Sequence, residues 1–296
     1  MGWVMEEELK RAFLEAARRA LDEDLGARGD VTTEALIPRD LEGVGEIYVW
    51  EDGVVAGLPL ASMVFRLLSP RVDFRPLKRD GERVTRGEVL AEIRGPLHAI
   101  LEGERTALNF LQRLSGIATV TARCVEVAAP RGVEILDTRK TTPGLRELEK
   151  YAVRAGGGAN HRKGLYDGVL IKDNHIAVVG SPGEAVRRAR ERLRGMFPVE
   201  VEIRDLEQLE EVIAAGADMV LLDNFTPGEV REAVRQAAGR VVLEVSGGVT
   251  PDNLEDYVST GVDRISMGYL THSSRALDMS LELRCPGGRA SKDRGR

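Results

Sequence analysis

The spacing of apolar residues changes along the chain, and this change predicts two domains. Residues 6–22 place apolar side chains at helical intervals between charged ones, which predicts an amphipathic helix that packs by one face. Short β-rich segments follow, separated by turns that contain Gly and Asp: GEIYVW at 45–50, VDFRPL at 72–77 and VLAEIRG at 89–95. A long helix predicted over 102–127 links this small α/β domain to the rest of the chain.

Beyond Gly132, apolar runs alternate with helical segments. The runs are VEIL (133–136), DGVLI (167–171), VEVEI (199–203), DMVLL (218–222), VVLEV (241–245) and DRISM (263–267), with helices expected at 184–194, 205–215, 228–238 and 251–260. Continuous apolar runs joined by helical crossovers are typical of parallel strands buried on both faces. This order fits either an α/β barrel or an open, doubly wound sheet.

The position of the polar residues favours the barrel. They gather at or just after the ends of the apolar runs: Asp137, Thr138, Arg139 and Lys140; Lys172, Asp173, Asn174 and His175; Glu202; Asp223 and Asn224; Ser246, Gly247 and Gly248; and Gly268. Chemistry at many successive strand ends is the arrangement of α/β-barrel enzymes. We place the N-terminal α/β domain at 1–110 and the barrel at 111–274, and we expect residues 275–296 to pack back or to form a flexible tail.

Composition narrows the class of protein further. Of the 296 residues, 43% are hydrophobic and 30% are charged, and no apolar run is long enough to span a bilayer, so we expect no membrane association. The three glutamates at 6–8 precede the first apolar positions, which is the wrong charge order for a secretory signal and leads us to expect a cytoplasmic location. A net charge of -6 argues against nucleic-acid binding.

The stretch DTRKTTPGLRELEKYAVRAGGGANHRKGLYD (137–167) contains the basic residues Arg139, Lys140, Arg162 and Lys163. For Arg146 or Lys163 alone, a solvated surface charge is an equal alternative. Arg139, Lys140, Arg162 and Lys172 together are harder to explain in that way, because planar guanidinium groups bind carboxylates through paired hydrogen bonds. The sequence therefore predicts a small substrate with several negative charges. His161, next to Arg162, could donate to a carboxylate, whereas His98, His175 and His272 are as well explained as structural residues.

Two further patterns predict a phosphate site and a pair of carboxylates. SGG (246–248) and MGYLTHS (267–273) follow the last two apolar runs, where barrel loops grip phosphate through backbone N–H groups and a helix start. Glu202 and Asp223 each end an apolar run. They could bind ribose hydroxyls, hold Mg²⁺ or stabilise positive charge on a sugar carbon, and Asp223 could instead cap the following helix.

From about Asp24 to about Leu281 the chain resembles the quinolinate phosphoribosyltransferase family, also called decarboxylating nicotinate-nucleotide pyrophosphorylase. The resemblance rests on the order and density of several segments: ERTALNFLQRLSGIAT (104–119), the stretch 137–167 quoted above, IKDNH (171–175), VEVE (199–202), LLDN (221–224), SGG and SMGYLTHS (266–273). It implies an α/β fold in which an N-terminal α/β domain accompanies an incomplete, open α/β barrel.

The resemblance also implies the reaction. Members transfer a phosphoribosyl group from phosphoribosyl pyrophosphate to quinolinate with decarboxylation, giving nicotinate mononucleotide, pyrophosphate and CO₂, with Mg²⁺ as the helper ion. The implied enzyme is nicotinate-nucleotide diphosphorylase (carboxylating), a pentosyl glycosyltransferase of de novo NAD biosynthesis.

Roles for individual residues follow from the same resemblance. Arg139, His161, Arg162 and Lys172 are implied to face the quinolinate carboxylates, with Arg105 supplied by a partner subunit in a homodimer or higher homo-oligomer. Lys140, Glu202, Asp223, Ser246, Gly247, Gly248 and Gly268 are implied to line the phosphoribosyl pyrophosphate site, and Thr138, Met267 and Tyr269 complete the substrate-binding set. We take Lys140, Glu202 and Asp223 as catalytic, Glu202 and Asp223 as magnesium ligands, and Glu200 as the alternative to Glu202 if the strand register is displaced. Tyr269 departs from the family pattern, which has a small residue there.

Two other functions remain open from the sequence. One is a paralogue that uses the same fold on a different base, such as the relatives associated with molybdenum uptake or a nicotinate phosphoribosyltransferase. The other is a ligand-binding barrel that kept the pocket as a sensor without turnover. Release of CO₂ from quinolinate would separate the decarboxylating enzyme from both.

Overall fold

The structure, a computed structural model, describes residues 7–284 and divides into two compact units. Unit 1 comprises residues 1–119, 147–156 and 275–296, and unit 2 comprises 120–146 and 157–274. Helix α4 (Leu97–Ala128) continues without a break from one unit into the other, and the division falls within it, after Thr119. Helix α5 (Arg146–Ala155) lies in the sequence between segments of unit 2 but belongs to unit 1 apart from its first residue.

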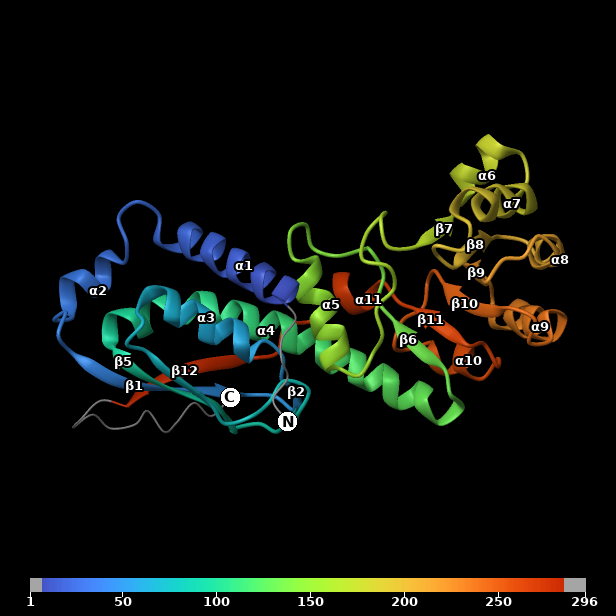
Figure 1. Ribbon diagram of the computed structural model, residues 1–296. Coiled ribbons are helices and arrows are strands. Elements are labelled where there is room, and N and C mark those ends of the chain that lie inside the picture. Colours follow the sequence, from blue (N-terminus) through green and yellow to red (C-terminus); the bar gives the residue numbers. More distant parts are fainter. Residues whose placement is uncertain (1–6, 285–296) are drawn as a thin grey trace. The chain divides into compact units, whose positions relative to one another are not determined.

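Unit 1 is built on a four-stranded antiparallel sheet in the order β12-β1-β5-β3 (Figure 1). Its strands are β1 (Glu42–Val49), β3 (Asp73–Pro76), β5 (Val89–Pro96) and β12 (Met279–Arg284), with a small ribbon of β2 (Gly53–Val54) and β4 (Arg83–Val84). Its helices are α1 (Glu7–Leu25), α2 (Val31–Leu36), α3 (Leu58–Leu68) and the first part of α4. Strand β12 pairs along its whole length with residues 44–49 of β1, so the described part of the C-terminal segment lies in the sheet of unit 1.

Unit 1 is held together by buried apolar faces and by a few buried polar contacts. On α4, Leu108, Leu111 and Leu114 are almost completely buried, as the apolar stripe of this helix predicts. Helix α5 is anchored by Tyr151, whose hydroxyl donates to Asp80 at 2.6 Å, and by the fully buried Glu149, which accepts from Arg113 at 2.9 Å. These contacts explain why α5 groups with unit 1.

Unit 2 contains a six-stranded, wholly parallel sheet in the order β6-β11-β10-β9-β8-β7. The strands are β6 (Glu134–Leu136), β7 (Val169–Ile171), β8 (Val199–Ile203), β9 (Met219–Asp223), β10 (Val242–Ser246) and β11 (Arg264–Ser266). Among the described residues, β6 and β7 share no ladder; an isolated bridge joins Leu136 to Ala159 beside that edge. Five pairs of neighbouring strands are therefore joined by ladders, and the two end strands, β6 and β7, are not. This gap confirms the open barrel.

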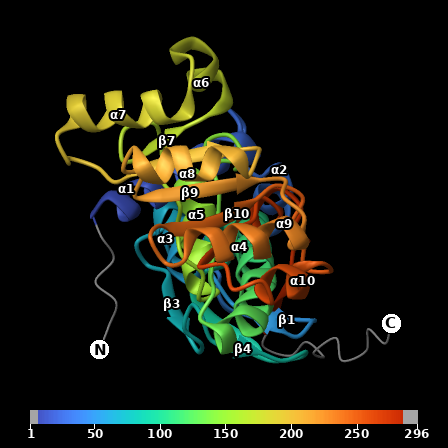
Figure 2. The ribbon, with the colours of Figure 1, turned by 90° about the vertical axis from the view of Figure 1, so that its right-hand side faces the viewer.

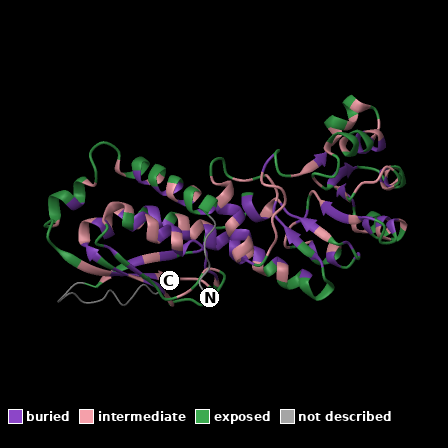
Figure 3. Ribbon diagram, in the orientation of Figure 1, coloured by how far each residue is buried: buried purple, intermediate pink, exposed green. Residues whose placement is uncertain are grey.

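The helices of unit 2 are α6 (Asp173–Val179), α7 (Pro182–Leu193), α8 (Glu207–Ala214), α9 (Pro227–Ala237), α10 (Leu254–Val258) and the four-residue α11 (Tyr269–His272), after the short 3₁₀ turn η1 (Ala129–Arg131). The four helices expected from the sequence correspond to α7 to α10, whereas α6 and α11 were not predicted. Helices α7 to α10 lie one after another along the outer face of the sheet (Figure 2). The strands beneath them are mostly buried, while the outward sides of the helices are exposed (Figure 3). No helix within residues 7–284 has both the length and the apolar character to cross a bilayer.

Candidate active site

Alternation along the barrel strands places acidic and hydroxyl side chains on the inner face of the sheet. On β8, Val199, Val201 and Ile203 face the helices, so Glu200 and Glu202 point the other way, and all five residues are buried. Strand pairing puts Asp223 beside Ser246, at the carboxyl ends of β9 and β10. Asp223 and Ser246 thus lie at the same level of the strand ends, whereas Glu202 is paired with Leu221, two residues before Asp223, and lies one layer deeper on the same face. Glu200, which is paired with Met219, lies one layer deeper again.

Glu202 forms an ion pair with a lysine at the end of the neighbouring strand. Lys172, directly after β7, donates its ammonium group to Glu202 Oε2 at 2.5 Å. The Glu202 side chain is 6% exposed and that of Lys172 is 44% exposed, so the carboxylate is fixed in the wall while the ammonium remains reachable from solvent. Two residues predicted for different substrates are therefore neighbours.

Asp223 does not cap the following helix. Helix α9 has Thr226 as its N-cap, and Thr226 and Glu229 bond reciprocally in a capping box. Asp223 instead has Arg204 Nε at 3.6 Å from its Oδ2, and the same guanidinium binds Asp173 at 2.8 Å. The helix-capping alternative is wrong, and Arg204 is a rim cation that the sequence reading missed.

Arg139 and Arg162 form the cationic part of the site. The Nε atom of each is buried and has no hydrogen-bond partner within residues 7–284. Burial lowers the pKa of Arg162, and the positive charge of nearby Arg139 lowers it further, with Glu200 acting in the opposite direction. Two neighbouring guanidinium groups, each with an unpartnered Nε donor, are stabilised by an anion that can accept from both.

The loops that carry these arginines are fastened by neighbouring residues. Arg146 donates to Thr141 Oγ1 and to the carbonyl oxygens of Lys163 and Arg139 at 3.0–3.2 Å, so its planar group links both loops. The fully buried Asp137 accepts from the amide of Asn160 at 2.6 Å and from the backbone N–H of His161 at 2.9 Å. The alternative that Arg146 is a solvated surface charge is therefore wrong.

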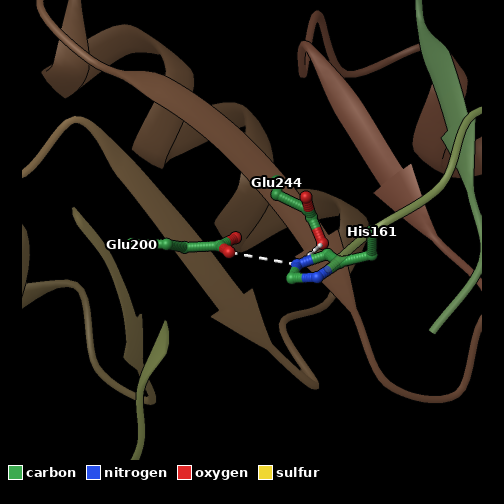
Figure 4. A group of neighbouring side chains, drawn as sticks. All are labelled: His161, Glu200 and Glu244. Atoms are coloured by element: carbon green, nitrogen blue, oxygen red, sulfur yellow. Dashed lines mark ion pairs between the residues drawn. The ribbon is translucent and has the colours of Figure 1, made fainter. Parts of the chain in front are cut away.

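His161 lies between two buried carboxylates, Glu200 and Glu244 (Figure 4). Its Nε2 is 3.0 Å from Glu200 Oε2 and 3.5 Å from Glu244 Oε1, and its Nδ1 accepts the backbone N–H of Arg162 at 2.8 Å. Burial, and then the negative charge of Glu200, raises the pKa of Glu244 to about 7. Glu244, which lies beside His161, was not among the residues predicted from the sequence.

These three side chains offer ligand atoms within 4.8 Å of one another, which is close enough for one metal ion to contact all three. A neutral imidazole that binds a metal through Nε2 carries its proton on Nδ1. Here Nδ1 accepts the Arg162 N–H, so it has no proton, and a metal on Nε2 would require an imidazolate. The local hydrogen bonding therefore disfavours a metal at His161.

The first of the two loops predicted to bind phosphate, at Ser246–Gly248, contains two glycines in the left-handed region. Gly247 and Gly248 both have positive φ angles, 90° and 66°. A Cβ on Gly247 would lie 2.3 Å from the Asn224 Oδ1 atom, so only glycine fits there. The N–H of Asn224 donates to the Ser246 carbonyl at 2.8 Å, which ties the ends of β9 and β10 together.

The loop after β11 adjoins the basic loop after β6. Thr271 donates its hydroxyl to the Lys140 carbonyl at 2.7 Å, and the Lys140 side chain lies beside Gly268. Thr138 accepts the N–H of Lys140 at 3.1 Å. Met267 is buried, and Tyr269 is the half-buried first residue of α11. Lys140, Thr138, Gly268 and Thr271 are thus brought together, whereas Arg105 is an exposed residue of α4 in unit 1.

The chain matches two domains of one known protein family. The C-terminal domain of quinolinate phosphoribosyl transferase matches residues 117–282, and the N-terminal domain of the same family matches residues 30–115. The chain belongs to the quinolinate phosphoribosyl transferase family.

Individual relatives are similar over nearly their whole length. A Bacillus subtilis (strain 168) protein named "Probable nicotinate-nucleotide pyrophosphorylase (carboxylating)" is 48% identical over 261 residues, which cover 88% of this chain and 90% of that protein. The Mycobacterium leprae (strain TN) nicotinate-nucleotide pyrophosphorylase (carboxylating) is 43% identical, covering 92% and 97%. The crystal structure of NadC from Streptococcus pyogenes superposes with a TM-score of 0.87 at 41% identity, covering 91% of this chain and 95% of that one.

This phosphoribosyl transferase family member also has a cavity of about 760 Å³ that is lined by residues of unit 1. Leu58, Phe74, Asp80, Tyr151 and Arg154 are among its lining residues. Asp80, the buried carboxylate there, accepts from the N–H groups of Gly57 and Leu58 and from the Tyr151 hydroxyl. These hydrogen bonds give Asp80 a structural role in joining α5 to α3.

Proposed function

We propose that this protein transfers the phosphoribosyl group of phosphoribosyl pyrophosphate to quinolinate and releases CO₂, giving nicotinate mononucleotide and pyrophosphate for NAD biosynthesis. Membership in the quinolinate phosphoribosyl transferase family supports this reaction. The observation that carries it is the pair Arg139 and Arg162, whose buried Nε atoms lack partners in the described chain, next to a rim of carboxylates. That combination suits a small dianion on one side and a sugar that develops positive charge on the other.

In this proposal, quinolinate binds through its two carboxylates. Arg139 and Arg162 provide forked donors, and Lys172 provides a third cation when it leaves Glu202 for the substrate. Binding places the pyridine nitrogen toward the rim formed by Glu202 and Asp223. A substrate with a single carboxylate, such as nicotinate, would leave one guanidinium group unsatisfied and would bind more weakly.

The transfer step forms one bond and breaks another. The nitrogen lone pair attacks the anomeric carbon of the ribose while the carbon–oxygen bond to pyrophosphate breaks, and that electron pair leaves with pyrophosphate. Positive charge grows on the sugar, where Glu202 and Asp223 stabilise it, and negative charge grows on the leaving group near Lys140. The turns at Ser246–Gly248 and at Gly268 hold the 5′-phosphate by backbone N–H groups.

Decarboxylation follows from the charge on the new pyridinium. The carboxylate next to the ring nitrogen leaves as CO₂, and the positive nitrogen stabilises the electron pair that remains on the ring carbon until a proton replaces it. No further cofactor is needed for this loss. A pocket that excludes water favours it, because the reacting charges are dispersed.

Magnesium fits the residues at the rim. The Asp223 carboxylate has Arg204 at 3.6 Å, and Glu202 presents a second carboxylate on the neighbouring strand. One or two carboxylates together with substrate phosphates are the usual ligands of Mg²⁺ in proteins. Bound there, Mg²⁺ would supply positive charge against the pyrophosphate oxygens, with Glu202 and Asp223 as its protein ligands.

We also propose that the active enzyme is a homodimer or higher homo-oligomer in the cytoplasm, with the partner's Arg105 completing the quinolinate pocket. The exposed position of Arg105 on α4 supports this role. Mixing Arg105→Ala and Glu202→Gln subunits, each impaired alone, should then restore activity, because one site of a mixed dimer would contain both native residues. Mixed subunits as inactive as the two separate variants would show that Arg105 does not act in the partner's site.

The test of the function is turnover of purified protein with phosphoribosyl pyrophosphate, Mg²⁺ and either quinolinate or nicotinate. We expect nicotinate mononucleotide from quinolinate and none from nicotinate. Product from nicotinate would assign the chain to the non-decarboxylating transferases. Binding of quinolinate without product would favour the sensor.

A further inference from the structure

We infer that His161 is a positioning residue rather than a donor to the substrate, and that Glu200 and Glu244 act through it to fix the loop that carries Arg162. The inference rests on the proposed function, because it assigns Arg162 to the quinolinate pocket. Its geometric basis is that both ring nitrogens of His161 are engaged by the protein itself. This reverses the role that the sequence predicted for His161.

The tautomer of His161 follows from its neighbours. A backbone N–H is always a donor, so the Nδ1 atom that lies 2.8 Å from the Arg162 nitrogen must accept and carries no proton. The proton is then on Nε2, where Glu200 Oε2 at 3.0 Å accepts it and Glu244 Oε1 at 3.5 Å is the next acceptor. In this state the ring directs no N–H group at a bound dicarboxylate.

The surroundings of the ring make this arrangement hard to change. The Glu200 and Glu244 side chains are 3% and 1% exposed, and each has one oxygen without a hydrogen-bond partner among the described residues. Glu200 Oε2 is the oxygen nearest the ring, and losing His161 as its donor would add the desolvation cost of a second oxygen of this buried carboxylate. His161 is therefore held toward β8 and β10.

The consequence is a fixed position for Arg162. His161 accepts the N–H of Arg162, while its own backbone N–H donates to Asp137 at 2.9 Å, so this peptide is fastened on both sides. The Arg162 guanidinium is then held by Nη1 donating to the Gly168 carbonyl at 3.2 Å, which leaves its Nε for an anion. The buried carboxylates thereby orient an arginine that they do not bind directly.

The first test reads the tautomer directly and does not need turnover. The chain has four histidines, so nitrogen and carbon chemical shifts of ¹⁵N,¹³C-labelled protein can be assigned by loss of one ring in His161→Asn. We expect the Nε2–H tautomer at neutral pH, unchanged when quinolinate is added. A His161 ring that is protonated on Nδ1, or that gains a hydrogen bond to ¹³C-labelled quinolinate, would overturn the inference.

The second test is a double-mutant cycle on the dissociation constant of quinolinate, measured by calorimetry. His161→Asn moves the side-chain amide away from Glu200, and Glu200→Leu removes the acceptor. If both act through the same contact, each should weaken binding by about tenfold, and the double variant should be no weaker than either. Additive losses would mean that His161 contacts the substrate independently.

Conservative variants separate positioning from a general loss of structure. Glu200→Gln keeps an acceptor and should recover most of the affinity for quinolinate that is lost in Glu200→Leu. His161→Gln, whose amide reaches the place of Nε2, should bind quinolinate better than His161→Asn.

Glu134→Leu, on the same face of the sheet but paired with Arg264, is the matched control and should bind quinolinate normally. Thermal unfolding of every variant identifies any that fail to fold. Failure of Glu200→Gln to recover binding in a folded protein would contradict the inference, whereas absent turnover with intact quinolinate binding would contradict only the proposed function.

Discussion

Lys172 and Glu202 are paired at 2.5 Å between the ends of β7 and β8, so the cation proposed for quinolinate and the carboxylate proposed for the sugar neutralise each other. If Lys172 binds quinolinate as proposed, it must leave Glu202, and the Glu202 charge is then exposed only when an anion has taken Lys172. Such an exchange would make the negative charge of Glu202 available to the sugar only when quinolinate is bound.

Glu202→Gln should mainly lower kcat, by about a hundredfold or more, with a small change in either KM. The reason is that the charge acts on the sugar as the bond to pyrophosphate breaks. Steady-state kinetics with both substrates measures this, and Glu207→Gln, an exposed residue of α8, is the control. An effect confined to KM would contradict the assigned role.

Arg139→Ala should raise the KM for quinolinate by about tenfold to a hundredfold, the loss expected for a charge-assisted hydrogen-bond pair. The KM for phosphoribosyl pyrophosphate should change little. Arg231→Ala, which removes an exposed arginine from α9, should leave both constants unchanged. Normal quinolinate kinetics in Arg139→Ala would remove this residue from the anion pocket.

Arg146→Ala should destabilise the protein by about 1–3 kcal/mol and raise the KM of both substrates, because one guanidinium group fastens both loops. Arg146→Lys should recover little, since an ammonium group cannot make three bonds in the same plane. Denaturant unfolding and kinetics of the two variants provide the measurement. Full recovery by lysine would show that charge rather than geometry matters.

Gly247→Ala should weaken phosphoribosyl pyrophosphate binding, because the added Cβ would meet the Asn224 side chain at 2.3 Å. Gly239→Ala is the matched control: its φ angle is 73°, close to the 90° of Gly247, but a Cβ there meets no atom within 4 Å. Both variants carry the backbone cost of a positive φ, about 1 kcal/mol. Equal KM values in the two would refute a special role for the turn at Gly247.

Glu244→Gln should raise stability above pH 7 and flatten its dependence on pH. The folded-state pKa of about 7 exceeds the ordinary value of 4.5, owing first to burial and then to the charge of Glu200, while His161, Ser266 and Arg264 oppose it. Between these two pH values the unfolded chain has already released a proton that the folded chain retains, so the free energy of unfolding falls as pH rises. The difference between the wild-type and Glu244→Gln unfolding curves from pH 4.5 to pH 8 isolates this group. A constant difference over that range would disprove the raised pKa.

Much of the architecture could be predicted because parallel strands buried on both faces require continuous apolar runs. All six runs beyond Gly132 became strands, and polar residues after them, such as Lys172 and Asp223, lie at the carboxyl ends as expected. The long helix was also predicted, but its apolar stripe continues through residue 110, so spacing alone could not locate the change of unit.

The missed residues depend on contacts across the fold. Glu244 is one polar position inside an apolar run, and its proximity to His161 depends on a loop that is distant in the sequence. Arg146 looks like an exposed helical charge until the carbonyl groups of Arg139 and Lys163 converge on it. The one available signal was alternation: acidic residues at 200, 202 and 244 within buried strands indicate a polar barrel interior.

The central claim is tested most directly by following the two carboxylates of quinolinate separately. Purified protein is incubated with phosphoribosyl pyrophosphate, Mg²⁺ and quinolinate labelled with ¹³C in the carboxylate next to the ring nitrogen or in the other one. We predict labelled CO₂ only from the first substrate, in equal amount to nicotinate mononucleotide, with the second label retained in the product. Labelled CO₂ from the second position, or mononucleotide formed without CO₂, would contradict the account.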